Sequence, residues 1–447
     1  MTAADSATGE RALRRELGLV SAIALVINAT VGTGIFRTPA AVARYAGSLD
    51  ASLFVWVLGA VIALAGAFSV AELSAALPRA GGIYEPLRRA FGPRVAFVYG
   101  FAKIALLAPS AVGSFATLAA ESIESLAGLP PDRSREIAIA LAVIALALGI
   151  NLLRVRSSGA AQTIVTAVKY GGLVVLAFAG LALPFTPLEG PALSAPSVVT
   201  PSGVLAALVS VMWAYDGWAD LASVAGETRD APRTLPRALV IGTLAVAAIY
   251  LATNLGYARV LGLPGLITSG AGAEMPGARL AYATLGALGS RALSGLVVVS
   301  CVGGAMASLL TNSRALIPMA SDGTFFRALG RVDPSSGTPR LAVLVTSALG
   351  VLYVASRRFE ELTDGFVVGY FPFYALAIVA LFVLRKREPE LSRSFRTPLV
   401  LPIIFLAGAA LVLGGAMLDG GERMLVPAGV LSVGALLSFT RRMPTSE

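Results

Sequence analysis

The chain has 447 residues, of which 56% are hydrophobic and 14% are charged, and its mean hydropathy is +0.79. Soluble proteins carry roughly 25% charged residues, so a soluble globule is excluded. The net charge of +9 does not indicate a nucleic-acid partner, because the basic residues form short clusters between apolar segments. The chain has no histidine and a single cysteine, Cys301, so we expect no intrachain disulfide, no metal site and no cofactor.

Twelve apolar runs are long enough to cross a bilayer, which takes about 20 residues. In lipid only helices and closed barrels satisfy their own backbone, and runs without strict alternation are helices. We therefore predict an all-α integral membrane protein in which residues 1–447 form a single transmembrane domain. The predicted spans are residues 18–43, 51–77, 95–126, 136–153, 159–183, 203–224, 236–262, 290–317, 340–355, 363–384, 398–418 and 424–440.

The basic residues predict the orientation of these spans. The tails and the loops on the same side carry 23 of the 35 Lys and Arg residues, and the loops on the other side carry 9. Basic residues concentrate on the cytoplasmic side, so both termini are expected in the cytoplasm, with the protein in the cytoplasmic (inner) membrane. The chain has no GxxxxGK[ST] motif, which argues against ATP as an energy source. Any transport is therefore expected to be secondary.

Two spans carry glycines near mid-membrane. Gly32 and Gly34 interrupt the first span before Pro39, and Gly217 follows Asp216 in the sixth. Glycine weakens a helix by about 1 kcal/mol relative to alanine and lets the backbone approach a ligand, although many glycines in membrane helices only permit close packing. The two interruptions lie five spans apart. They predict two inverted repeats, at about residues 17–183 and 201–384, followed by two extra helices at 398–440.

An interrupted helix exposes amide donors at the start of its second half and carbonyl acceptors at the end of its first half. A carboxylate suits the amides and an ammonium suits the carbonyls. Two such breaks lying side by side are therefore expected to bind an α-amino acid through the backbone, while neighbouring residues select its side chain.

At this point the chain resembles the amino acid, polyamine and organocation superfamily, and most closely its L-amino-acid transporter branch. The similarity covers nearly the whole chain in the right order, and the joint order of its motifs is more specific than any one of them. The motifs are Gly32–Phe36, Glu72–Leu73, Leu77–Tyr84, Ala214–Trp218, Gly226–Thr228, Leu235–Ala238, Arg314, Asp322–Gly323 and Gly337–Pro339.

The resemblance implies the leucine-transporter fold, with five plus five inverted helices, two extra helices and alternating access. It implies that the substrate carboxylate docks on amides from Val31 to Gly34, including Gly32 and Thr33, and the ammonium on carbonyls near Thr30, Trp213 and Ala214. Trp213 matches an aromatic residue that closes over substrate, as a gate, although an interfacial anchor is an equal reading for a tryptophan. Weaker pocket candidates are Ser110, Tyr370 and Phe371.

Lysines are scarce, with three against 32 arginines, so an intramembrane lysine suggests function. Lys169 matches the position where sodium-independent members of the resembled family place an ammonium in the site of a sodium ion. We expect it to donate to carbonyls of the broken first helix, and the alternative is a lysine that snorkels to the surface. Lys103, about nine residues into the third span, is expected to snorkel.

Three acidic residues in or beside spans have different expected roles. Glu72 is expected to pair with loop arginines. Asp216, inside the second break, could favour a cationic substrate or hold the local backbone, and we slightly favour the structural role because broken backbone needs partners. The role of Asp220 stays open.

The sequence thus predicts a sodium-independent carrier of neutral L-amino acids that works as an exchanger or a proton symporter. One alternative is a carrier of cationic amino acids or polyamines, and another is an amino-acid sensor that does not transport. An enzyme is not expected, because no pair of acids shows a metal-ligand spacing and histidine is absent. Relatives in this branch can pair with a partner subunit through a cysteine after the third span. Residues 127–135 contain none, so no disulfide-linked partner is expected.

Overall fold

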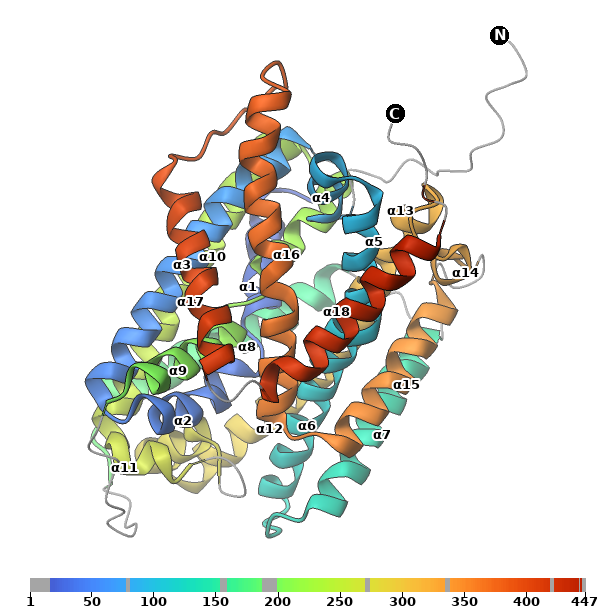
Figure 1. Cartoon of the computed structure of the whole chain (residues 1–447). Helices are drawn as coiled ribbons and strands as arrows, with labels where there is room; N and C mark the ends of the chain where they lie inside the picture. The colour runs from blue at the N-terminus through green and yellow to red at the C-terminus, as the bar shows by residue number, and fades with distance from the viewer. Residues whose placement is uncertain are drawn as a thin grey trace.

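The protein is a bundle of helices (Figure 1). The structure, a computed structural model, describes residues 17–77, 81–152, 159–186, 199–269, 274–333, 338–418, 422–441 and 443. Over these residues the chain forms α-helices, one π-helical turn and one 3-10 helix, without any β-strand. The prediction of an all-α membrane protein is confirmed in this respect.

Most predicted spans coincide with a long apolar helix. In the described residues eight continuous helical segments are long and apolar enough to cross a membrane, and a bent pair makes a ninth. Three further apolar helices are shorter, so the number of twelve spans stays a prediction. The eight segments are α3 (Leu49–Ala76), α5 with η1 and α6 (Pro93–Leu126), α7 (Arg133–Leu152), α9 (Pro201–Ala214) with the start of η2 (Trp218–Glu227), α10 (Ala231–Val260), α12 (Pro276–Arg314) with α13 (Leu316–Ser321), α16 (Phe359–Arg387) and α17 (Val400–Leu418).

The bent pair is α1 (Leu19–Thr30) and α2 (Gly34–Ala46), whose axes differ by 43°. The shorter apolar stretches are Thr166–Ala182 within α8 (Gly159–Ala182), the whole of α15 (Arg340–Ser356) and Met424–Thr440 within α18 (Glu422–Thr440). Three short helices lie outside the predicted spans: α4 (Tyr84–Phe91), α11 (Gly262–Ile267) and α14 (Arg327–Gly330).

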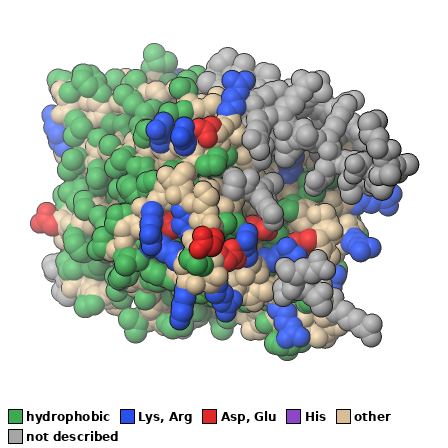
Figure 2. Space-filling model, turned by 90° about the horizontal axis from the view of Figure 1, so that it is seen from above, with side chains coloured by type: hydrophobic (Ala, Val, Ile, Leu, Met, Phe, Trp, Pro, Cys, Tyr) green, Lys and Arg blue, Asp and Glu red, His purple; other side chains and the backbone are tan. Residues whose placement is uncertain are grey.

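The outside of the bundle is apolar, as expected of a surface that faces lipid. Large hydrophobic side chains such as Phe54 on α3, Phe178 on α8 and Leu425 on α18 are more than half exposed. The interior is packed with aromatic and small residues, among them the fully buried Trp56 and Tyr250. Figure 2 shows one end of the bundle, where charged side chains gather in the middle and hydrophobic side chains cover much of the rim.

Both ends of the described chain lie at the same side of the bundle, together with α4, which we call the terminus side (Figure 1). Helix α11 lies at the other side, which we call the opposite side.

Two helices depart from their predicted course. Helix α12 begins at Pro276 rather than at residue 290, and Gly286, with φ of 72°, separates a first leg from the rest. The helix-forming run before Gly286 contains Arg279, which hid it from a search for uninterrupted apolar spans. The third span is interrupted by a π-helical turn, η1 (Lys103–Leu107), between α5 (Pro93–Ala102) and α6 (Ala108–Leu126).

Candidate functional site

The two broken helices lie against each other and run in opposite directions. At one end the amide of Arg229, just past η2, donates to the carbonyl of Leu17, just before α1, over 2.9 Å. At the breaks, Gly34 lies directly against Ala214. Each half of one helix therefore packs beside a half of the other, α1 beside η2 and α2 beside α9.

Two glycines make this close crossing possible. A Cβ atom at Gly34 would lie 2.5 Å from the Cα atom of Ala214, and one at Gly217 would lie 2.5 Å from the carbonyl oxygen of Ala29. Gly217 also has φ of 110°, which L-residues with side chains rarely adopt. Both glycines are thus required by contact between the backbones of the two helices, which is the close packing that glycine commonly permits in membrane helices.

At the first break, part of the predicted donor set is already engaged. The amide of Val31 donates to Ile27 O over 2.7 Å, and the amide of Gly32 donates to Thr30 O over 2.8 Å. Thr33 and Gly34 stand at the first turn of α2, where amides have no partner within the helix. The structure therefore narrows the candidate carboxylate donors to these two amides.

The acceptors at the breaks are narrowed in the same way. Thr30 O also accepts the hydroxyl of Tyr250 over 3.0 Å, so both of its lone pairs are used. Trp213 O accepts the amide of Asp216 over 3.3 Å. Ala214 is the last residue of α9, and the last carbonyls of a helix have no partner within it. The Ala214 carbonyl is therefore the remaining candidate for a substrate ammonium.

Side chains at the crossing are buried and polar. Trp213 is 9% exposed, and its Nε1 donates to Thr33 Oγ1 across the two breaks over 3.2 Å. Thr30 Oγ1 is buried and has no hydrogen-bond partner among the described residues. A buried hydroxyl without a partner costs free energy, so the crossing contains a polar atom that a ligand can satisfy.

An aromatic column on α16 connects this crossing to the end of the second break. Phe366, Tyr370 and Tyr374 stand four residues apart, which places them on one face of the helix. The ring of Trp213 lies 5.0 Å from that of Phe366, Phe366 lies 5.4 Å from Tyr370, and Tyr370 stacks on Tyr374 at 4.1 Å. The hydroxyl of Tyr374 then donates to Asp216 Oδ1 over 2.7 Å.

A further aromatic residue of α16 lies beside the column. Phe371 packs against Phe405 of α17, with ring centroids 6.1 Å apart, and against Tyr374 of the column, at 6.0 Å, so its role in the pocket stays a prediction. Tyr370 lies in the column, as its candidate role requires. Sequence reasoning missed Phe366 and Tyr374, although their four-residue spacing from Tyr370 was visible.

Helix α6 contributes an aromatic residue that the sequence analysis also missed. Phe115 lies against Gly32, where an added Cβ would stand 3.4 Å from its ring, and against Gly304 of α12. The candidate Ser110 is buried, and its carbonyl accepts the hydroxyl of Ser114 within the same helix. Phe115 therefore contacts the first break directly.

Lys169 lies where it can act on the first broken helix. It is 6% exposed, and its Nζ donates to Asn28 Oδ1 of α1 over 3.2 Å. A lysine that snorkels would be exposed, so that alternative is wrong. We had expected Lys169 to donate to a backbone carbonyl of the first broken helix, but the bond goes to the side chain of Asn28. Lys103 is buried too, at 5% exposed, so the prediction that it snorkels is wrong.

An all-helical bundle in which two broken helices cross in opposite directions at mid-span defines a secondary membrane transporter of the leucine-transporter type. Comparison with known proteins makes the class specific. The chain belongs to the amino acid permease family, whose model matches residues 17–437.

Its relatives are transporters rather than enzymes. It is 30% identical over 419 residues to the serine/threonine exchanger SteT of Bacillus subtilis, covering 92% of this chain and 93% of that protein. It is 28% identical to the human b(0,+)-type amino acid transporter 1, covering 88% and 80% of the two chains. It is 29% identical to the mouse Asc-type amino acid transporter 1, covering 94% and 80%.

Proposed function

We propose that the protein carries neutral L-amino acids across the cytoplasmic membrane by alternating access, without sodium, as an exchanger or a proton symporter. Both termini face the cytoplasm in this proposal. The observation that carries it is the crossing of the two breaks, where the first amides of α2 stand beside the last carbonyls of α9. An amino acid has its carboxylate and its ammonium on one carbon, so a single backbone crossing can bind both.

The helix ends add charge complementarity. The N-terminus of α2 carries a partial positive charge and the C-terminus of α9 a partial negative charge. Gly34 and Ala214 are in contact, so these two poles lie within the span of one substrate molecule. Trp213, bonded to Thr33, is positioned to cover the substrate as a gate.

Independence from sodium rests on Lys169. Its amino group is buried and donates to Asn28 of α1, so a basic group stands beside the first break. The name of the serine/threonine exchanger, the relative that is 30% identical, supports exchange of small neutral amino acids. The only cysteine, Cys301, is buried, so we propose that no disulfide-linked partner subunit is needed.

A carrier of cationic amino acids or polyamines is the second candidate, and the observation that favours it is the pair of acids at the second break. Asp216 and Asp220 stand four residues apart at the second break, and both are partly buried. A sensor without transport is distinguished from both by the same assay.

The test is uptake of a radiolabelled amino-acid panel into proteoliposomes, with and without internal amino acid, sodium and a pH gradient. We expect uptake of neutral amino acids that ignores sodium, and a strong reduction in Lys169→Ala. The matched control is Lys386→Ala, since Lys386 is the exposed third lysine at the end of α16. Sodium-dependent uptake would contradict the role of Lys169. Binding without uptake would indicate a sensor, and uptake of cationic substrates alone would indicate the second candidate.

A further inference from the structure

Two reciprocal pairs of an arginine and a phenylalanine join α5 to α18 at the terminus side. Arg94 of α5 lies over the ring of Phe439 of α18, 4.9 Å from its centroid. Arg441, just past the end of α18, lies over the ring of Phe97 of α5 at 5.4 Å. We call these four residues the arginine seam. Each helix thus supplies one guanidinium group and one ring.

A third helix meets the arginine seam. Arg441 also lies 4.5 Å from the ring centroid of Phe326, and its Nη2 donates to the carbonyl of Phe325 over 3.3 Å. Arg327 follows directly as the first residue of α14 and is exposed. The end of α18 lies beside α14 in Figure 1. Three arginines, from α5, α14 and the end of α18, therefore gather at one corner of the bundle.

The positive charges of this corner are not compensated. Within the described ranges none of the three arginines pairs with a carboxylate, whereas Arg88 pairs with Asp322 and Arg89 pairs with Glu388. Nη1 of Arg441 is buried and has no hydrogen-bond partner in the described part of the chain. A buried donor without an acceptor costs free energy. The corner thus lacks an anionic acceptor.

Stacking on aromatic rings leaves the arginines able to bind a phosphate. A guanidinium group is planar, and its five N–H donors lie in the plane while its face stacks on a ring. Arg94 and Arg441 use their faces on Phe439 and Phe97. In-plane donors remain, and guanidinium groups bind phosphate oxygens through two parallel hydrogen bonds.

An apolar strip on α18 leads to the arginine seam. Val433, Leu436 and Phe439 stand three residues apart, and they are 47%, 68% and 67% exposed. This spacing places them along one side of the helix. The strip ends at the ring that Arg94 covers. Hydrocarbon can thus lie along the strip while a phosphate attached to it reaches the guanidinium groups.

We propose that this corner of α5, α14 and α18 binds an anionic phospholipid of the leaflet at the terminus side. The headgroup phosphate lies on Arg94, Arg327 and Arg441, and an acyl chain lies along the apolar strip. Basic pockets between membrane helices bind anionic headgroups in this way. A zwitterionic lipid carries its own cation beside the phosphate, so an uncompensated cluster of arginines favours an anionic lipid.

The experiment measures lipid binding to the full chain in micelles of a neutral detergent. Fluorescent phosphatidylglycerol or phosphatidylcholine is the probe, and its fluorescence polarisation is followed as protein is added. We expect wild type to bind phosphatidylglycerol about tenfold or more tighter than phosphatidylcholine. The variant Arg94→Gln/Arg441→Gln should bind phosphatidylglycerol about 25-fold more weakly, since each arginine at a membrane surface contributes about fivefold.

The matched control removes the same charge from arginines that have a carboxylate partner. Arg89 pairs with Glu388, and Arg233 pairs with Asp230. We expect Arg89→Gln/Arg233→Gln to bind phosphatidylglycerol like the wild type. A loss in this control as large as that in Arg94→Gln/Arg441→Gln would show a general effect of net charge and would overturn the proposal.

Two exposed positions keep the test decisive if the seam variant does not fold. Arg327→Gln should weaken phosphatidylglycerol binding about fivefold. Leu436→Gln places an amide on the apolar strip and should also weaken it, whereas Leu352→Gln should not, since Leu352 is an equally placed leucine on α15 that is 58% exposed. Unchanged binding in folded Arg327→Gln and Leu436→Gln contradicts the proposal.

The remaining outcomes concern the source of the phosphate. Equal binding of phosphatidylcholine and phosphatidylglycerol by wild type would show that the corner does not recognise negative charge. Displacement of the probe by free sn-glycerol 3-phosphate, together with wild-type binding in Leu436→Gln, would assign the corner to a soluble phosphate ester. Either result overturns the lipid site, and neither depends on whether the protein moves amino acids.

Discussion

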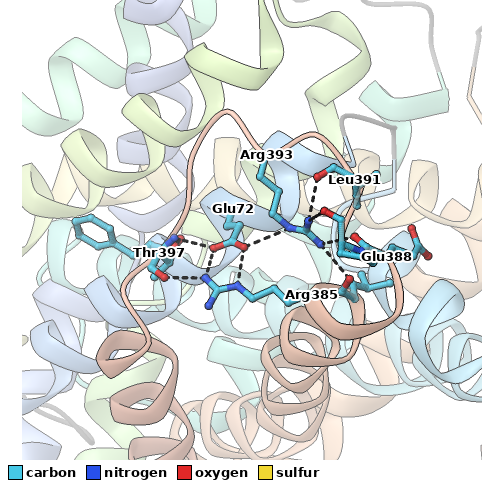
Figure 3. Close-up of polar contacts among 9 residues, drawn as sticks. Glu72, Arg385, Glu388, Leu391, Arg393 and Thr397 are labelled. Atoms are coloured by element: carbon cyan, nitrogen blue, oxygen red, sulfur yellow. Dashed lines mark hydrogen bonds and ion pairs between the residues drawn. The ribbon is translucent and has the colours of Figure 1, made fainter.

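Two ion clusters hold the two ends of α16, and they differ in how completely their charges are satisfied. On the terminus side, Glu72, Arg385, Arg393 and Thr397 form what we call the Glu72 cluster (Figure 3). On the opposite side, Arg37, Arg44, Glu121 and Glu360 form what we call the Arg37 cluster.

The Glu72 cluster is buried, and both carboxylate oxygens of Glu72 accept hydrogen bonds. Glu72 is 1% exposed and accepts Nε of Arg385 over 2.8 Å and the amide of Thr397 over 2.7 Å. Arg393 adds an ion pair at 3.6 Å and donates to the carbonyls of Leu384, near the end of α16, and of Leu391, in the segment after it. The expectation that Glu72 pairs with loop arginines is confirmed.

The carboxylates of the Arg37 cluster are partly exposed. Arg37 is 3% exposed, but the carboxylates of Glu121 and Glu360 are 24% and 25% exposed. Arg37 pairs with each of them at 2.9 Å, and Arg44 reaches Glu360 at 3.6 Å. Both arginines stand on α2, the half-helix that follows the first break.

The difference indicates which end separates more easily. When an exposed ion pair opens, its charges regain water and little free energy is lost. Separating a buried carboxylate from its arginines leaves uncompensated buried charges, which strongly destabilises the protein. The Glu72 cluster joins α3 to α16 and the segment before α17, where no break occurs. The Arg37 cluster joins a half-helix of the crossing to α6 and α16, so we expect it to separate more easily than the Glu72 cluster.

The largest effect is expected at the Glu72 cluster. Glu72→Ala leaves Arg385 and Arg393 buried beside each other without a carboxylate, which should lower the free energy of unfolding by about 3 to 5 kcal/mol. Thermal unfolding in detergent, followed by size-exclusion chromatography, measures this loss. A melting profile like that of the wild type would show that the cluster is not structural.

An intermediate effect is expected at the Arg37 cluster. Glu360→Gln should lower the free energy of unfolding by about 1 kcal/mol or less, but it should raise the population open on the opposite side about fivefold. Maleimide labelling of Ala41→Cys, in a Cys301→Ser background, reports this opening because Ala41 is buried in α2. Unchanged labelling together with a large loss of stability would show that the Arg37 cluster stabilises the fold and does not control opening.

Salt should sharpen the same contrast at lower amplitude. Raising the ionic strength shortens the Debye length from about 10 Å at 0.1 M to about 3 Å at 1 M, which weakens pairs that water reaches. We expect labelling of Ala41→Cys to increase with salt, whereas the melting temperature changes little. If labelling stays constant and the melting temperature falls steeply, then salt weakens the Glu72 cluster and not the Arg37 cluster. The comparison between the two clusters would then be wrong.

The smallest effect is expected at a surface pair near the Glu72 cluster. Arg89 and Glu388 pair at 2.6 Å, but both are about one-third exposed. Glu388→Ala should change the free energy of unfolding by about 1 kcal/mol or less and leave serine uptake unaltered. It is the matched control for Glu72→Ala, because both remove a glutamate from an arginine on the same side.

Much of the fold could be predicted because a membrane-spanning helix needs a run of about 20 apolar residues, which can be found directly in the sequence. The two breaks were also visible, since Gly34 and Gly217 serve contacts that only glycine permits. The start of α12 at Pro276 was missed because Arg279, which donates to Thr268 and Ser269 in the segment after α11, breaks the apolar pattern.

The site was harder, because it depends on which side chains meet across helices. The sequence placed Lys169 inside the bundle, yet it did not reveal that Asn28 is its partner. It assigned Lys103 to the surface, since nothing in the local pattern shows the rings of Tyr99 and Tyr370 around it. It named Tyr370 and Phe371 but missed Tyr374, because the face of a helix that turns toward the crossing is set by tertiary packing.

The π-helical turn at Lys103–Leu107 also bears on how the chain can be compared and redesigned. A π turn spans i to i+5 instead of i to i+4, so it holds one residue more than the same length of α-helix. Deleting one residue within it should restore a regular helix without rotating α6, whereas deleting one residue within α6 itself would turn everything beyond it by about 100°. A relative that lacks the turn therefore aligns with this chain only through a one-residue gap here, and the gap falls beside the buried lysine.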